Sequence, residues 1–240
     1  MPRFICAAII GLMVLLAGPA YAVDRDWSQD VAATPEGGFV MGNPDANLKL
    51  VEFVSMSCPH CATFDAEAHD RLVDEVKTGR LSYEIRNMVR DPFDSTAALV
   101  ARCGGPERFF ALTHRLLANQ EEWIGKLTDM PQQDLDSLQA MPPEEQYQTI
   151  AGWAGFAQYA TAEGLDAEAM NACLLDPSGT DQLNQIYNSA METYGIRGVP
   201  AFLINGELAS GSTWAELEPQ LETGDDQQEL TLKNDRPAAF

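Results

Sequence analysis

The alternation of apolar and polar positions defines a strand, a helix and a second strand in the first half of the chain. Residues 48–56 form an apolar run rich in Val, Leu and Phe, which predicts a buried strand. Beyond it, apolar side chains recur every four residues, as along one face of a helix: Phe64, Ala68, Leu72 and Val76. Gly79 ends this pattern, and residues 81–89 alternate like a strand. This order predicts a parallel βαβ unit.

Helical periodicity replaces the strand pattern from residue 94 to about residue 195. Five segments have the spacing and the end signals of helices: residues 96–103, 106–119, 144–163, 166–175 and 180–194. Residues 125–143 are less regular, and we expect them to be only weakly helical. Residues 94–195 are therefore predicted to be an all-helical domain.

Strands return after this helical block. Residues 201–204 and 207–210 flank Asn205-Gly206, a dipeptide that favours the tight turn of a β-hairpin. A short closing helix is expected at residues 213–221. The order is thus βαβ, then helices, then ββα, which predicts an α/β fold with one sheet. That sheet domain would consist of two parts, residues 39–93 and 196–222, with the helical domain inserted between them.

The segments before and after these elements are predicted to contribute little to the fold. Residues 39–41 predict a short edge strand, and the polar residues 23–38 predict a loosely held arm. Residues 223–240 are acidic and polar, and we expect a disordered tail.

The N-terminal stretch has the pattern of a secretory signal peptide. Arg3 precedes an apolar run over residues 4–16, which is shorter than a membrane span. Ala20-Tyr21-Ala22 fits the small-x-small cleavage rule. We predict a signal peptide at residues 1–22, cleaved after Ala22, and an exported protein. An uncleaved membrane anchor is the alternative.

The net charge of the chain argues against one class of partner, nucleic acids. The chain carries a formal net charge of −21 at pH 7. A chain this acidic offers no basic surface to meet phosphates, so we expect no nucleic-acid partner. Acidity by itself mostly reports solubility.

Four cysteines remain of the five once Cys6 leaves with the predicted signal peptide. Four cysteines in an oxidising compartment allow three pairings. The close spacing of Cys58 and Cys61 favours their pairing, which leaves Cys103 with Cys173. The second pair would close a loop of about 70 residues and add roughly 4 kcal/mol of stability in the chain-entropy model. We interpret it as a structural disulfide, with a second redox pair or free thiols as the alternatives.

The segment Ser57-Cys58-Pro59-His60-Cys61 lies at the start of the first predicted helix. Proline is tolerated in the first turn of a helix, and the unpaired N–H groups there favour an anion. Since only the thiolate attacks, Cys58 is predicted to be the exposed, attacking thiol and Cys61 the shielded, resolving one. His60 would add a polar donor, or a positive charge, beside Cys58.

Two further positions join this candidate site. Glu52 is an acid within the apolar strand pattern, where burial would raise its pKa and let it exchange a proton with Cys61. Val199-Pro200 follows Gly198 just before the hairpin. A cis bond there would place backbone groups of Val199 beside the disulfide, ready to pair with a substrate strand.

These residues together resemble the DsbA-like branch of the thioredoxin superfamily. The likeness rests on segments 51–53, 57–61 and 198–206, and covers residues 42–221 approximately. It implies a thioredoxin fold with an inserted helical domain, and a cis Val199-Pro200 bond. It also implies a periplasmic enzyme that donates its disulfide to reduced exported proteins and is reoxidised by a DsbB-type membrane quinone reductase. The simplest members lack a second pair such as Cys103 and Cys173.

Other interpretations of the same residues remain open. A Cys-x-x-Cys pair can hold zinc or act as a structural disulfide, and the chain could be an isomerase, a reductase, or a binding or chaperone module. Isomerases of this kind add an N-terminal dimerisation module, and the arm before Gly42 is too short for one, so we expect a monomer. We expect no cofactor and no metal. His69 and His114 are predicted to be exposed helix residues.

Overall fold

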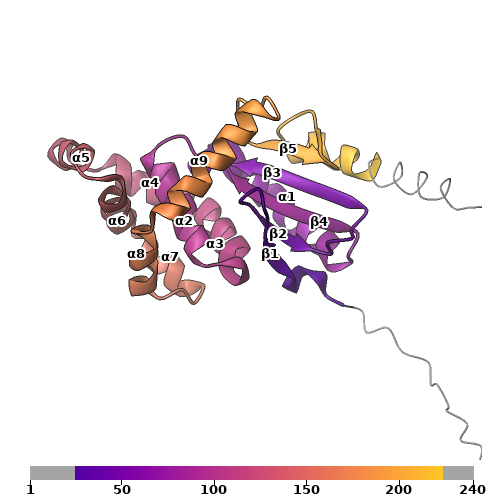
Figure 1. Ribbon diagram of the computed structural model, residues 1–240, viewed down its shortest axis with the longest axis horizontal. Coiled ribbons are helices and arrows are strands. Elements are labelled where there is room, and N and C mark those ends of the chain that lie inside the picture. Colours follow the sequence, from indigo (N-terminus) through magenta and orange to yellow (C-terminus); the bar gives the residue numbers. More distant parts are fainter. Residues whose placement is uncertain (1–24, 224–240) are drawn as a thin grey trace, which may run out of the picture.

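The sheet predicted from the two separated parts of the chain forms in the computed structural model, which describes residues 25–223. Its strand order is β1-β2-β4-β3-β5-β6 (Figure 1). The strands are β1 (Val31–Ala33), β2 (Phe39–Gly42), β3 (Leu48–Val54), β4 (Leu81–Asn87), β5 (Ala201–Ile204) and β6 (Glu207–Leu208). β3 pairs parallel with β4 and antiparallel with β5, so the α/β fold with a central βαβ unit and a later hairpin is confirmed.

Besides a helical segment at residues 214–223, nine labelled α-helices lie within residues 25–223. They are α1 (Pro59–Lys77), α2 (Pro92–Cys103), α3 (Pro106–Ala118), α4 (Gln120–Thr128), α5 (Gln132–Gln139), α6 (Pro143–Ala154), α7 (Phe156–Ala162), α8 (Ala167–Leu174) and α9 (Pro177–Glu192). A 3-10 turn, η1 (Trp27–Gln29), precedes β1, and residues 214–223 are helical.

Helices cover both faces of the sheet. On one face, the predicted apolar stripe of α1 is buried together with Leu50 of β3. On the other face, Ile186 and Ala190 of α9 are buried in one cluster with Phe53 of β3. Because side chains alternate along a strand, Glu52 shares the face of Leu50 and is directed toward α1. The strand thus carries this acid to the side on which α1 begins.

The helical domain lies to one side of the sheet, and α9 runs back from it to β5 (Figure 1). A disulfide joins Cys103, at the end of α2, to Cys173 in α8, with 5.9 Å between the Cα atoms. Trp123 of α4 is fully buried, and its indole N–H donates to the carbonyl oxygen of Leu116 at 2.9 Å. The buried side chains of this helical domain, called the helical lobe below, form one continuous apolar core with those between α1 and the sheet.

The N-terminal arm was predicted to be loose, and that prediction is wrong over residues 27–33. η1 and β1 form there, and β1 pairs antiparallel with β2. As a result, β2 lies between β1 and β4 and is not the predicted edge strand. A strand of three residues is too short to show a periodicity of its own, so its pairing partner decides its structure.

Several helix boundaries also differ from the prediction. Residues 144–163 are two helices, α6 and α7, because Gly155 adopts a left-handed conformation with φ of 74°. The weakly helical segment 125–143 contains the end of α4 and all of α5. The helical block begins earlier than residue 94, since Asp91 accepts hydrogen bonds from Phe93 N and Asp94 N and starts α2 at Pro92.

The predicted signal peptide, residues 1–22, lies outside the described residues, as does the predicted tail apart from residue 223. Within residues 25–223, no helix is both long and apolar enough to cross a membrane.

Candidate active site

Cys58 lies where β3 gives way to α1. It is the N-cap residue of α1, with Pro59 in the first turn and Cys61 one turn further along. Both cysteines are free thiols, so the structure shows the dithiol form of the pair. The prediction that Cys58 is exposed is wrong: its relative exposure is 4%, against 0% for Cys61. Little of Cys58 is therefore open to a partner sulfur in this dithiol form.

The two thiols have opposite acidities. Hydrogen bonding from Cys61 is the main cause that lowers the pKa of Cys58 to about 5, with help from the backbone N–H groups of Cys61 and His60. The pKa of Cys61 is raised well above its ordinary value by the same interaction, by burial and by Glu52. Near pH 7, Cys58 is thus a thiolate and Cys61 a thiol, which divides the pair into a nucleophile and a proton-bearing partner.

The loop before β5 lies against Cys58. The Val199-Pro200 peptide bond is cis. The Cys58 sulfur lies 3.5 Å from the carbonyl oxygen of Val199, to which it can donate a hydrogen bond only in its protonated form. The structure therefore brings Val199 to Cys58, although 141 residues separate them in sequence.

Glu52 is buried behind the thiols with a relative exposure of 2%. Its Oε2 accepts a hydrogen bond from the Tyr83 hydroxyl, and its Oε1 has no hydrogen-bond partner in residues 25–223. Burial is the main cause that raises the pKa of this carboxyl to about 8, and the Tyr83 hydrogen bond opposes the shift. Glu52 therefore keeps its proton at neutral pH and can exchange it near Cys61.

Tyr83 was missed in the sequence. The register pairs Leu50 with Tyr83 and Glu52 with Ile85, so Tyr83 lies on the same face of the sheet as Glu52. A parallel alignment of the two predicted strands could have suggested this pair, but the register itself cannot be read from the sequence.

Asp94, at the start of α2, is another buried carboxylate near the thiols, and no pattern in the sequence marked it. Its carboxylate accepts hydrogen bonds from Ser55 Oγ (2.7 Å), Met56 N (2.7 Å), Ser57 N (3.3 Å) and Arg90 N (3.0 Å). Three of these donors belong to the turn that leads into Cys58. Burial raises the pKa of Asp94 to about 6, so it is ionised at neutral pH. The first helix of the lobe thus fixes the turn before the thiols.

Replacing Asp94 with asparagine should lower the free energy of unfolding by about 2 kcal/mol, because an amide turns an N–H group toward buried donors. Urea unfolding at pH 7.5 measures the change. Ser55→Ala is the matched comparison: it removes one donor, leaves the other three, and should cost about 1 kcal/mol. An Asp94→Asn protein as stable as the wild type would show that the carboxylate does not hold the turn.

The helical lobe supplies a second contact to this turn. The buried Gln120 side chain donates through Nε2 to the carbonyl oxygens of Met56 (2.8 Å) and Cys58 (3.0 Å). Those carbonyl groups flank the reactive sulfur. The sequence did not predict the contact of Gln120 with residue 58, because nothing in the predicted helix boundaries places these two residues close together.

Arg90 supplies part of what was expected of the His60 side chain, a positive charge beside Cys58. The His60 side chain is exposed, and it is the backbone N–H of His60 that contributes to the lowered pKa of Cys58. Arg90 supplies the positive charge, and its guanidinium donates to Ser55 Oγ and Ser57 Oγ at 3.2 Å each. Positive charge therefore reaches Cys58 from the segment between β4 and α2.

The comparisons with known proteins agree with this geometry. A family model described as thioredoxin matches residues 34–223. The chain belongs to the thioredoxin family. A Rickettsia felis protein, named as a candidate protein-disulfide oxidoreductase, is 24% identical over 83% of this chain. The chain spans 64% of that relative's length.

Two solved structures show how far the likeness extends within this thioredoxin-family fold. A protein-disulfide isomerase from Novosphingobium aromaticivorans is 34% identical, with a TM-score of 0.73 over 79% of this chain and 97% of its own. Wolbachia pipientis alpha-DsbA1 is 18% identical, with a TM-score of 0.64 over 80% of this chain and 93% of its own. The expected DsbA-like architecture, with helices inserted in a thioredoxin fold, is confirmed.

Proposed function

We propose that the protein is a periplasmic thiol:disulfide oxidoreductase that introduces disulfides into exported proteins through Cys58 and Cys61. The observation that carries the proposal is the unequal acidity of the two thiols, with a pKa of about 5 for Cys58 and a raised pKa for Cys61. A low pKa stabilises the reduced form, and a stabilised reduced form makes the disulfide a strong oxidant. The protein-disulfide oxidoreductase name of the Rickettsia felis relative supports this chemistry.

The reaction would begin with the Cys58–Cys61 disulfide. A substrate thiolate attacks the sulfur of Cys58, the bond between Cys58 and Cys61 breaks, and Cys61 leaves with the electron pair. Glu52, whose carboxyl is protonated at neutral pH, can supply the proton that Cys61 takes up. A second substrate thiolate then attacks the substrate sulfur of the mixed disulfide and releases Cys58 as a thiolate. The substrate loses two electrons, and the enzyme gains them.

The backbone of Val199 would hold the substrate during this exchange. Its carbonyl oxygen already faces the Cys58 sulfur. An extended substrate segment could pair with this backbone as an added strand, which recognises main chain and tolerates many sequences. Such recognition suits an enzyme with many clients.

Further turnovers require the two electrons to leave the dithiol. We propose that a DsbB-type membrane quinone reductase accepts them and that the protein acts as a monomer.

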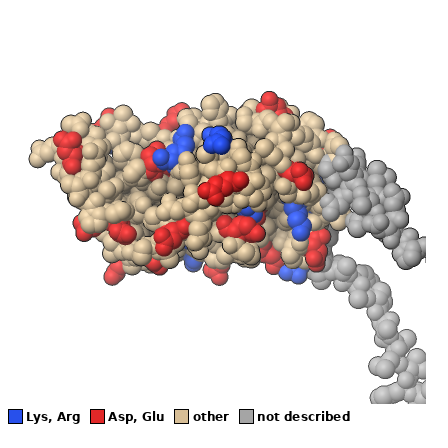
Figure 2. All heavy atoms as spheres, turned by 45° about the horizontal axis from the view of Figure 1, so that its top comes forward, with Lys and Arg blue, Asp and Glu red and all other residues tan. Residues whose placement is uncertain are grey.

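The surface has no extended basic area on the face shown in Figure 2, where acidic side chains are spread widely. This distribution agrees with protein clients better than with nucleic acid.

Disulfide isomerisation is the second candidate, because the Novosphingobium aromaticivorans structure is named as a protein-disulfide isomerase. An isomerase works from the dithiol form, in which Cys58 attacks a wrong disulfide and leaves again without net oxidation. Both activities use the same pair of thiols, so the reduction potential and the reaction product distinguish them.

We expect the Cys58–Cys61 couple to be more oxidising than thioredoxin, above roughly −270 mV, because the Cys58 thiolate is stabilised. Equilibration with glutathione redox mixtures measures the potential, and a reduced two-thiol peptide measures net oxidation. A thioredoxin-like potential would contradict the oxidase proposal. Efficient repair of a scrambled disulfide protein, without oxidation of the peptide, would favour the isomerase.

A further inference from the structure

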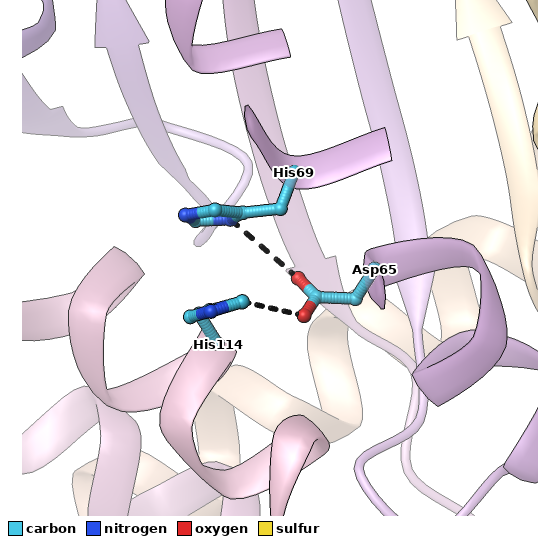
Figure 3. A group of neighbouring side chains, drawn as sticks. All are labelled: Asp65, His69 and His114. Atoms are coloured by element: carbon cyan, nitrogen blue, oxygen red, sulfur yellow. Dashed lines mark hydrogen bonds and ion pairs between the residues drawn. The ribbon is translucent and has the colours of Figure 1, made fainter. Parts of the chain in front are cut away.

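Two histidines and an aspartate meet between α1 and α3 (Figure 3). Asp65 and His69 are four residues apart on α1, so both lie on one face of that helix. His114 comes from α3, which packs against this part of α1. Its Nδ1 lies 2.7 Å from Asp65 Oδ2, and the Nδ1 of His69 lies 3.7 Å from Asp65 Oδ1.

The prediction that both histidines are exposed helix residues is wrong. The side chains of His69 and His114 are 24% and 40% exposed, and that of Asp65 is 11% exposed. The two imidazole rings stack with centroids 3.8 Å apart and an interplanar angle of 18°. Both rings therefore lie beside the same carboxylate. A neutral imidazole is the form that binds a metal ion.

The donor atoms of the three side chains are close enough to share one ion. One potential ligand atom from each residue lies within 4.8 Å of the other two. Ligands around a tetrahedral zinc ion, at about 2.0–2.2 Å from the metal, are roughly 3.3–3.5 Å apart. Side-chain rotations that bring the ligand atoms closer by up to about 1.5 Å would therefore complete the site, and the partial exposure of the three side chains allows such rotations.

We propose that Asp65, His69 and His114 form a binding site for a divalent transition-metal ion such as Zn²⁺. Two imidazoles and one carboxylate suit zinc and its neighbours, whereas calcium and magnesium prefer oxygen ligands. Three protein ligands leave a fourth position of the tetrahedron for water. Among residues 25–223, these three form the one group of His, Cys, Asp and Glu side chains with this spacing.

A bound ion would join the two parts of the fold. α1 begins at the reactive cysteine, and α3 belongs to the helical lobe. An ion that binds Asp65 and His69 on one helix and His114 on the other would cross-link them. It would resist unfolding of the lobe from the sheet, because binding to the folded state alone stabilises that state.

Isothermal titration of a Cys58→Ser/Cys61→Ser protein with Zn²⁺ tests the proposal, since this background lacks the thiols that could bind zinc themselves. We expect one ion per chain. Asp65→Asn, His69→Gln and His114→Gln should each weaken Zn²⁺ binding at least tenfold, because each removes one of three ligands. At a hundredfold excess of Zn²⁺ over Kd, the Tm should rise by roughly 5–10 °C, and the three variants should lose most of this rise.

Glu67→Gln is the matched control, because Glu67 is an exposed acid on the opposite side of α1. It should bind Zn²⁺ as the parent does. The Tm of every variant without metal shows whether it folds, and the rise with Zn²⁺ is compared only for folded variants. Binding that survives all three substitutions, or that Glu67→Gln weakens equally, would overturn the site. If the protein did not bind one Zn²⁺ ion per chain, the metal site would also be overturned, and the cluster would be an ion pair between His114 and Asp65.

Discussion

Replacing Cys61 with serine should convert the protein into a trap for disulfide partners. The Cys58 thiolate of this variant can still attack a substrate disulfide, forming a mixed disulfide and releasing the other substrate sulfur as a thiolate. In the wild type, Cys61 would then attack Cys58 and release the substrate. Without it, release depends on external thiols and should slow by about 10³-fold or more, since an internal group acts at a very high effective concentration.

The burial of the site strengthens this expectation. Cys58 is 4% exposed and lies under the Val199 carbonyl, so a small external thiol reaches the mixed disulfide poorly. Cys61, one helical turn away, needs no such approach. Mass spectrometry of the intact protein after incubation with a disulfide-bonded peptide measures the adduct.

Cys58→Ser is the matched control for this trap. It removes the attacking thiolate and should give no adduct, although it retains Cys61. An adduct of equal yield on Cys58→Ser would show that Cys61 is the attacking thiol and would contradict the assignment. Both variants retain the Cys103–Cys173 disulfide, so the stability of the lobe is not altered between them.

The sequence predicts those parts of the site whose residues lie close together in the chain. The apolar run before Cys58 and the four-residue spacing after it were enough to place the thiol pair between a strand and a helix. The Asn205-Gly206 turn likewise predicted the hairpin, because a two-residue turn is decided by its own residues. These features depend on neighbours in the chain, which a single sequence displays.

The contacts that were missed all depend on packing between distant segments. Asp94 holds the turn at residues 55–57 from almost forty residues away. Gln120 reaches Cys58 from 62 residues away, and His114 meets Asp65 across 49 residues. No periodicity marks such pairs, since their spacing in sequence is set by the loops between the elements. The apolar pattern predicts which helices form but not how they pack together.

Replacing Glu52 with glutamine should remove a marked pH dependence of stability. The folded protein holds the Glu52 proton to a pKa of about 8, against an ordinary value of 4.5. Between these two values the unfolded chain has lost this proton while the folded chain keeps it. The free energy of unfolding of the wild type therefore declines as pH rises from about 4.5 to 8 and levels off above 8. The contribution of Glu52 to this decline is on the order of 3–5 kcal/mol.

Glutamine is neutral throughout this pH range, so the free energy of unfolding of the Glu52→Gln variant lacks this decline. The difference in free energy of unfolding between Glu52→Gln and the wild type should thus grow in favour of the variant from pH 5 to pH 8.5. Urea unfolding at several pH values measures it, with the Cys58–Cys61 disulfide formed in both proteins so that no thiol at the site titrates. Taking the difference cancels the contribution of Asp94, which also has a raised pKa.

The Tyr83→Phe variant separates two effects on the pKa of Glu52, that of burial and that of the hydrogen bond from Tyr83. The Tyr83 hydroxyl donates to Glu52 and opposes the rise in its pKa, so removing it should move the end of the decline to a pH above 8. Glu67→Gln removes an exposed acid and should leave the pH profile parallel to that of the wild type. If Glu52→Gln also remained parallel, Glu52 would be ionised in the folded protein at neutral pH, and it could not supply the proton that Cys61 needs when the disulfide opens.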